Sequence, residues 1–271
     1  SAICGYLQGL LMNLSTQRLS RGLRQEISQK INRLPLKYLD STPYGDPPVN
    51  GGQGINEWSQ ADLMKLLNPN YQNEAVGGSL YWNSGSGTCY GWDNASEEDT
   101  SIPCDFTNSG LSANARNKIE TVKWTIGGWN DSGIYPNQIY EYERRENVIQ
   151  NPDDGIKRTT VWPGKVALAY PSDYGYAADL DSCSEKLNYY VNCTGVNWMY
   201  SSLTMNGNNW SWLLTPASSN AGDAWYVTSD GLVGSYGNVY YDYGVSPVFY
   251  LDSELGMVTG DGSPETPFVV R

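Results

Sequence analysis

Apolar side chains recur every three or four residues along residues 6–34, and basic side chains lie between them. This spacing places the apolar side chains on one face of an α-helix, so the pattern predicts one long helix. Pro35 ends it, because proline interrupts the helical hydrogen-bond ladder. Residues 42–54 are rich in Gly, Pro and Asn and predict a linker. The apolar stripe comprises Leu7, Leu10, Leu11, Leu14, Leu19, Leu23, Ile27, Ile31 and Leu34.

From residue 56 onward the apolar segments become shorter and alternate with turns. A helix is expected from Ser59, with Asp62 three residues later as in a capping box, to Asn68. Residues 111–124 predict a second helix. Pro136 predicts the start of a third, because proline suits the first helical position. The stripe of the second helix comprises Leu111, Ala115, Ile119 and Val122.

The remaining apolar segments predict short strands. Residues 159–169 indicate a hairpin around the Trp-Pro-Gly-Lys sequence that begins at Trp162. A turn is expected at Asp230 and Gly231. Two or three helices followed by short antiparallel strands and long loops are typical of an α+β domain. The other expected strands are residues 210–215, 224–229, 232–235 and 245–251.

Composition and charge narrow the range of functions. The chain has 21 Tyr and 10 Trp but 3 Phe, and rings with a polar tip suit sites that meet solvent or a ligand. It has no His, which excludes imidazole chemistry. Residues 1–46 carry six basic and three acidic side chains, whereas the remainder carries 11 basic and 26 acidic, a net charge of −15. A surface that acidic repels nucleic acid and anionic lipid.

Four of the five cysteines fall into two local pairs, Cys89 with Cys104 and Cys183 with Cys193, while Cys4 stands alone. Each pair would close a loop of roughly 10 to 15 residues, and such a disulfide contributes about 2 to 4 kcal/mol. The pairs therefore indicate an oxidising compartment. Free thiols in a cytosolic protein are the alternative. A zinc site is disfavoured, because no cysteine has a second one two to four residues away.

The first 46 residues resemble part of an ABC exporter. The stretch "LRQEISQKINRLPLKYLDSTPYGD" is similar to the region that leaves the membrane and enters the cytosol in that family. No Gly-x-x-x-x-Gly-Lys-Ser/Thr loop follows, so the chain has no phosphate cradle of that kind and is not expected to transport. The first 14 residues are too short and too weakly apolar to span a bilayer. The chain thus divides into residues 1–46, a linker at 47–54 and a domain at 55–271.

Residues 53–271 resemble a second family. The segments "NEWSQADLMKLLNP", "IETVKWTIGGWND", "ALAYPSDYGYAADLDSC", "NWSWLLTPASSNAGDAWYVTSDG" and "GVSPVFYLDSELGMVTGDGSPETPFVV" are similar to a domain of unknown function in gut Firmicutes, where it follows a pilin-like anchor. The last third is also similar to the variable proteins of diversity-generating retroelements. That resemblance implies a C-type-lectin-like fold and a ligand-binding task.

Polar and aromatic residues near the C-terminus favour a binding face. Tyr, Ser, Asn and Asp together supply rigid ring surface and adaptable hydrogen bonds, as in antibody paratopes. A solvated hairpin loop is the alternative interpretation, and the resemblance favours binding. The candidate ligand-binding residues are Ser218, Ser219, Asn220, Asp223, Tyr226, Ser229, Ser235, Tyr236, Asn238, Tyr240, Tyr241, Asp242 and Tyr243. The flanking residues predicted as core are Trp210, Trp212, Leu213, Leu214, Trp225, Val227, Val245, Val248 and Tyr250.

Three other motifs have both a chemical and a structural interpretation. "GGWND", which ends at Asn130 and Asp131, is similar to the calcium motif of sugar-binding C-type lectins, but its position after a helix favours a coincidental turn. "EYERR" at residues 141–145 indicates a charged helix end with exposed salt bridges. Asp173 is expected to hold a turn through its carboxylate. No metal and no cofactor are predicted.

The sequence therefore predicts a binding domain rather than an enzyme. A glycosidase would need two marked carboxylates, and none stands out among the acids. Formylglycine-generating enzymes share the implied fold but use a cysteine pair, and no cysteine follows Cys193. The expected partner is a protein or glycan outside the cell or at its surface, with membrane association only through a missing or N-terminal anchor. The alternatives are a transporter fragment, a carbohydrate-active enzyme and a structural pilin-like subunit.

Overall fold

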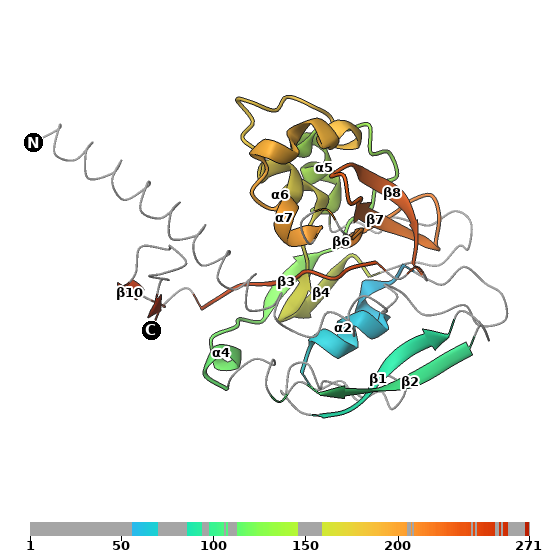
Figure 1. Ribbon diagram of the computed structural model, residues 1–271, viewed down its shortest axis with the longest axis vertical. Helices are drawn as coiled ribbons and strands as arrows, with labels where there is room; N and C mark the ends of the chain where they lie inside the picture. Colours follow the sequence, from blue (N-terminus) through green and yellow to red (C-terminus); the bar gives the residue numbers. More distant parts are fainter. Residues whose placement is uncertain are drawn as a thin grey trace, which may run out of the picture.

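A computed structural model gives the structure of the chain (Figure 1). The predicted helix at residues 6–34, the linker and the whole of the exporter-like segment lie outside the described residues. The structure describes residues 56–69, 86–93, 98–105, 107, 113–145, 159–204, 207, 209–239, 241, 243–252, 255, 257–259 and 269–270.

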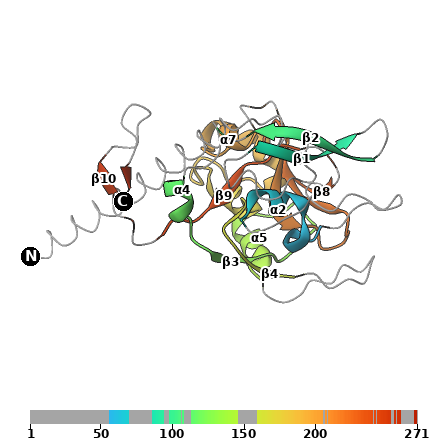
Figure 2. The ribbon, with the colours of Figure 1, turned by 90° about the horizontal axis from the view of Figure 1, so that it is seen from below.

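The described residues form an α+β structure, as the pattern predicted, with small antiparallel sheets. A three-stranded sheet has the order β6–β7–β8, with β6 at Ser211–Pro216, β7 at Asp223–Val227 and β8 at Val233–Asn238. In both views α4 and β10 lie on the opposite side of the molecule from β8 (Figures 1 and 2). The two-stranded sheets pair β1 (Ser86–Asp93) with β2 (Glu98–Asp105), β3 (Val122–Thr125) with β4 (Val161–Gly164), β5 (Val166–Leu168) with β9 (Pro247–Phe249), and β10 (Met257–Thr259) with β11 (Val269–Val270).

The helices are short, and two of them begin in the same way. The predicted helix start at Pro136 is confirmed, and at both α5 and α6 a proline follows a tyrosine at the N-cap. The third residue of each helix then accepts a hydrogen bond from that tyrosine's backbone N–H, through Gln138 Oε1 at 3.0 Å in α5 and Asp173 Oδ2 at 3.1 Å in α6. The expected turn-holding role of Asp173 is thereby confirmed. The helices are η2 (Trp58–Gln60), α2 (Asp62–Leu67), α4 (Ala113–Asn117), α5 (Pro136–Glu143), α6 (Pro171–Tyr176), η3 (Leu187–Val196) and α7 (Tyr200–Leu203). Within the part of the chain that the structure describes, none of them has the length and apolarity needed to cross a membrane.

The first predicted helix is right at its end and wrong at its start. A separate 3₁₀ turn, η2, precedes α2, and the Glu57 carboxylate accepts the Ser59 backbone N–H at 3.3 Å. The N-cap residue of α2 is Ala61, whose side chain makes no capping hydrogen bond. Asn68 ends it as predicted, and its side chain donates to the Met64 and Val166 carbonyls at 2.9 Å each.

Two other predicted elements are corrected. The helix expected at residues 111–124 stops at Asn117, and β3 starts at Val122, because Thr121, Val122 and Thr125 are β-branched and favour an extended chain. The hairpin expected at residues 159–169 does contain two strands, β4 and β5, but they pair with β3 and β9 instead of with each other. Only Lys165 separates them, which is too short for a hairpin turn.

The C-terminal strand predictions are confirmed. β6, β7, β8 and β9 lie within or beside the expected ranges, and the turn at residues 230 and 231 joins β7 to β8. Gly231 has a φ of +90°, a backbone conformation that favours glycine, and its N–H donates to the Thr228 carbonyl at 2.9 Å.

The β6–β7–β8 sheet separates two hydrophobic cores. Successive side chains of a strand point to opposite faces, so Trp212 and Leu214 belong to one core while Leu213 belongs to the other. The first core also holds Trp58, Leu63, Trp124, Trp162 and Val245, and the second also holds Tyr174, Leu187, Tyr190, Trp225 and Val227.

Most of the predicted core residues near the C-terminus are buried. Val248 is half-buried. The core prediction is wrong for Trp210 and Tyr250, which are exposed because they lie just outside the strands β6 and β9. It is confirmed for Trp212, Leu213, Leu214, Trp225, Val227 and Val245.

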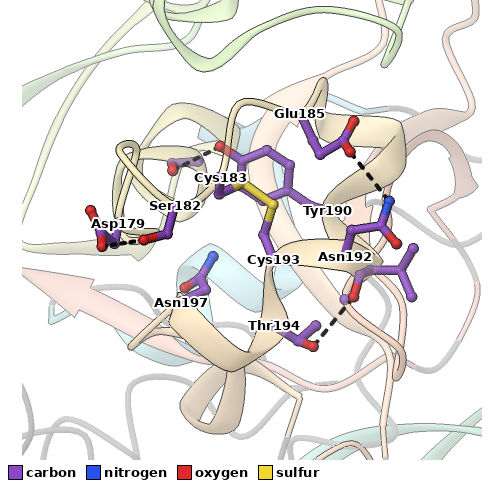
Figure 3. The surroundings of a disulfide bond; sticks show 12 residues. Asp179, Ser182, Cys183, Glu185, Tyr190, Asn192, Cys193, Thr194 and Asn197 are labelled. Carbon is purple, nitrogen blue, oxygen red and sulfur yellow. Dashed lines mark hydrogen bonds between the residues drawn. A yellow bond between two sulfur atoms is a disulfide. The ribbon is translucent and has the colours of Figure 1, made fainter.

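One predicted disulfide is present, between Cys183 and Cys193 (Figure 3). Both half-cystines are buried in the second core, and the bond ties the segment before η3 to the end of that helix. Outside the bond, Asn192 Nδ2 donates to Glu185 Oε1 at 3.4 Å (Figure 3). For the other pair, the backbone register of β1 and β2 places Cys89 opposite Ile102. The side chains of Cys89 and Cys104 lie outside the described part of the chain, so their disulfide stays a prediction. Cys4, which stands alone in the sequence, also lies outside the described residues.

Candidate functional site

The loop between β6 and β7 is held by Asn56, a residue far away in the sequence. The Asn56 amide nitrogen lies 3.0 Å from the Ala217 carbonyl, 3.0 Å from the Asn220 carbonyl and 2.7 Å from the Asp223 carbonyl. Its backbone N–H also donates to the Ala221 carbonyl at 2.7 Å. Because Asn56 is buried, these bonds are shielded from water, and they fix the conformation of the loop.

Two candidate residues of this loop bond to each other. Asn220 Nδ2 donates to Asp223 Oδ2 at 2.7 Å, and Asn220 Oδ1 accepts the Gly222 N–H at 2.9 Å. Asp223 is buried, and burial raises its pKa while the bond from Asn220 lowers it. These two side chains therefore support the loop itself, and Asn220, Ser218 and Ser219 are half-buried.

A second group of candidates contacts the GGWND loop. Ser235 is fully buried and donates to the Asn130 carbonyl at 2.9 Å, and Ser218 Oγ lies 3.4 Å from Asn130 Oδ1. The indole of Trp225 donates to the Trp129 carbonyl at 2.6 Å. The motif is thus a structural loop packed on the sheet. Asp131 accepts the Gly133 N–H at 2.8 Å, which agrees with the predicted turn.

The third group is a cluster of rings, here called the aromatic platform, which consists of Trp210, Tyr226, Tyr241 and Tyr243. The rings of Trp210 and Tyr226 are nearly parallel, with centroids 5.2 Å apart. Tyr243 tilts against both, at 5.2 Å from Trp210 and 5.5 Å from Tyr226, and Tyr241 lies 5.7 Å from Tyr243. Ring pairs at such separations attract each other beyond the area they bury.

Glycines in β8 let the platform lie close to the sheet. A Cβ at Gly234 would come within 2.4 Å of the Tyr226 ring, and one at Gly237 within 2.8 Å of the Trp212 ring. Beneath Tyr243 lies the buried ring of Trp212, with centroids 4.4 Å apart. The platform therefore sits on the first core, and any larger residue at these two glycines would displace it.

Two platform tyrosines, Tyr226 and Tyr243, stay neutral at physiological pH. Burial raises the pKa of Tyr243, and the neighbouring hydroxyls of Tyr226 and Tyr241 and the carboxylate of Asp223 raise it further. Burial and Asp223 likewise raise the pKa of Tyr226. The phenols of Tyr226 and Tyr243 consequently keep their protons, and each can both donate and accept a hydrogen bond.

Three aromatic side chains of this region reach solvent to a large extent. Trp210 is 41% exposed, Tyr241 is 45% exposed and Tyr236 is 60% exposed. Tyr236 lies in β8 where the register to β7 shifts. Sequence reasoning missed Trp210, which it assigned to the core, although its position one residue before the fully buried β6 marks it as a rim residue.

The predicted binding face is therefore divided over several places. Tyr226, Tyr241 and Tyr243 come together with Trp210, whereas Ser218 and Ser235 meet Asn130. Asn220 and Asp223 bond to each other, and buried Asn238 lies opposite Asp223 at the end of β8. Ser219 is half-buried in the β6–β7 loop, and Ser229 lies at the β7–β8 turn. Tyr240 and Asp242 lie outside the described residues.

A buried carboxylate, Glu143, is the main charged group that sequence reasoning missed. It lies at the end of α5 and accepts hydrogen bonds from the Ser172 hydroxyl and, at 3.3 Å, from the Ser172 N–H. Burial raises its pKa to about 7, and the bond from Ser172 and the charge of Arg144 oppose that rise. The expected salt bridge of this motif exists between Arg144 and Asp173, at 3.6 Å.

Nothing described in the structure forms a metal centre. The described residues hold no group of three or more His, Cys, Asp or Glu side chains that could bind an ion. No family model, curated protein or solved structure was found to match the chain.

Proposed function

We propose that residues 55–271 form a recognition domain of C-type-lectin-like fold that acts outside the cell or at its surface, on a protein or glycan ligand. The observation that carries this proposal is the aromatic platform, where Trp210 and Tyr241 reach solvent beside the fully buried strand β6. Partly exposed Trp and Tyr rings on a rigid support are the side chains that dominate binding energies in protein interfaces.

The rigidity of the support favours binding. Trp212 and Leu214 fix β6, and Asn56 fixes the loop that follows it. A surface that is already ordered loses little conformational entropy when a ligand binds, so more of the contact energy appears as affinity. Because the side chains of Asn220, Asp223 and Ser235 are hydrogen-bonded within the fold, the ligand surface is assigned to the platform and to the exposed ring of Tyr236 in β8.

The proposed location rests on the disulfide and on the family resemblance. A buried bond between Cys183 and Cys193 persists in an oxidising compartment. The resemblance of residues 53–271 to surface proteins of gut Firmicutes points the same way. Attachment to a membrane would then run through an N-terminal anchor.

A glycan array and a panel of purified extracellular proteins, both probed with the full chain, test the proposal. The Trp210→Ala/Tyr241→Ala double variant is expected to lose the signal, because it removes both exposed platform rings. Tyr189→Ala is the matched control, since Tyr189 is 55% exposed but lies in η3. Equal binding by the double variant and the wild type would overturn the assignment of the surface.

A further inference from the structure

Three tyrosine rings in or beside α5 and α6, those of Tyr140, Tyr142 and Tyr170, have a cation from the chain itself. The Arg144 guanidinium lies 3.5 Å from the centroid of Tyr170, and that of Arg145 lies 4.1 Å from the centroid of Tyr142. A cation over a ring face is attracted by the negative potential of the π system. Around α5 and α6, arginines of the chain itself therefore occupy the faces of these tyrosine rings.

The aromatic platform differs. Of the Lys and Arg residues that the structure describes, none is placed over the rings of Trp210, Tyr226 or Tyr243. These rings contact one another instead, and that of Trp210 is 41% exposed to solvent. Asp223 adds negative potential, since it acts electrostatically on both Tyr226 and Tyr243.

The charge of the whole domain acts in the same direction. Residues 47–271 carry 26 acidic and 11 basic side chains. A field of that sign raises the local concentration of cationic partners and speeds their association, and it disfavours anionic ones. The platform thus combines solvent-exposed ring surface, an adjacent carboxylate and an acidic domain.

Building on the proposed function, we propose that the platform binds a basic segment of a partner protein, with a Lys or Arg side chain seated on the ring faces of Trp210 and Tyr243. These two rings are tilted against each other, with centroids 5.2 Å apart at an angle of 55°, and Trp210 is 41% exposed. The 45% exposed ring of Tyr241 borders Tyr243 on a further side. A guanidinium gains more than an ammonium from such exposed rings, because it stacks on them and is weakly hydrated.

The probe is a fluorescent peptide of alternating Gly and Arg, titrated with the full chain and followed by anisotropy at physiological salt. Its counterpart replaces Arg by citrulline, which keeps the shape and removes the charge. We expect the citrulline peptide and the Trp210→Leu variant each to bind about tenfold more weakly, in line with a desolvated cation–π contact. Tyr189→Leu, which changes no charge either, controls for attraction by the domain's net charge and should bind as the wild type does.

Tyr241→Leu, at the rim of the platform, provides a second variant in case Trp210→Leu alters the fold, which circular dichroism would reveal. An unchanged affinity in the folded ring variants, or equal affinity for the Arg and citrulline peptides, would overturn the cationic-ligand proposal. If the cationic-ligand proposal is overturned but the Trp210→Ala/Tyr241→Ala variant still loses glycan or protein binding, the proposed recognition function stands without a cationic ligand. If no ligand depends on the platform, both proposals fall.

Discussion

Two regions of this domain use the same residue types in opposite ways. Around α5 and α6, tyrosines, arginines and carboxylates satisfy one another, with Arg144 between Tyr170 and Asp173 and with Glu143 bonded to Ser172. On the aromatic platform the rings satisfy mainly one another. In the first region the polar groups hold two helices together, whereas the second region presents ring surface to solvent. Composition alone does not distinguish the two regions, because the difference lies in which side chains each tyrosine contacts in the fold.

The sharpest test of this contrast compares two tryptophans that are two residues apart. Trp212→Ala is expected to lower the free energy of unfolding by about 4 kcal/mol, because it leaves a cavity in the first core under Tyr243. Trp210→Ala removes a partly exposed ring and should cost about 1 kcal/mol. Urea denaturation of both variants measures the difference. Similar losses would show that Trp210 is a core residue after all and would remove the exposed platform.

The next largest effect concerns Glu143 and pH. Its folded-state pKa of about 7 lies above the ordinary value of 4.5, so between these pH values the folded protein holds a proton that the unfolded chain has released. The contribution to stability is complete below pH 4.5 and is lost as the pH rises to 7, in total about 3 kcal/mol. The charged neighbours are Arg144 and Asp173.

Glu143→Gln isolates this contribution, because it keeps an acceptor for Ser172 and removes the titration. Urea midpoints measured at intervals from pH 4 to pH 8.5 should fall with pH more steeply in the wild type than in the variant. Parallel curves for the two proteins would mean that Glu143 does not carry a raised pKa and that the polar region near α6 is more hydrated than its burial implies.

A smaller effect is expected at the loop anchor. Asn56→Ala removes the amide that bonds to the carbonyls of Ala217, Asn220 and Asp223, and it should cost about 2 kcal/mol, since buried carbonyls lose a donor. Asn188→Ala, a half-buried asparagine in η3, is the control. Faster amide hydrogen exchange at residues 217–223 in Asn56→Ala alone would confirm the anchoring role, and unchanged exchange would contradict it.

The sequence predicted what local spacing determines and missed what distant partners determine. The start of α5, the strands β6 to β8 and the Cys183–Cys193 bond follow from proline position, alternation and loop closure within about ten residues. The pairing of β4 with β3 and of β5 with β9 was not visible, because the strands that compete for a partner lie far apart in the chain. The candidate residues are divided over several places for the same reason. The Ser235 hydroxyl donates a hydrogen bond to the carbonyl of Asn130, a residue 105 positions earlier, and no local sequence pattern indicates that contact.

The smallest predicted effect asks how much the internal cation contributes to the α5–α6 region. Arg144→Gln removes a cation from the ring of Tyr170 and an ion pair with Asp173, a group that is 40% exposed. Because exposed pairs contribute little, the loss of unfolding free energy should be about 1 kcal/mol, most of it from the ring contact. Adding 0.5 M salt separates the two parts, since salt screens the exposed ion pair more than the buried ring contact. If the difference in unfolding free energy between wild type and variant disappears in salt, the stabilisation comes from the ion pair. The tyrosine–cation contacts near α5 would then say little about which ligands the exposed platform rings bind.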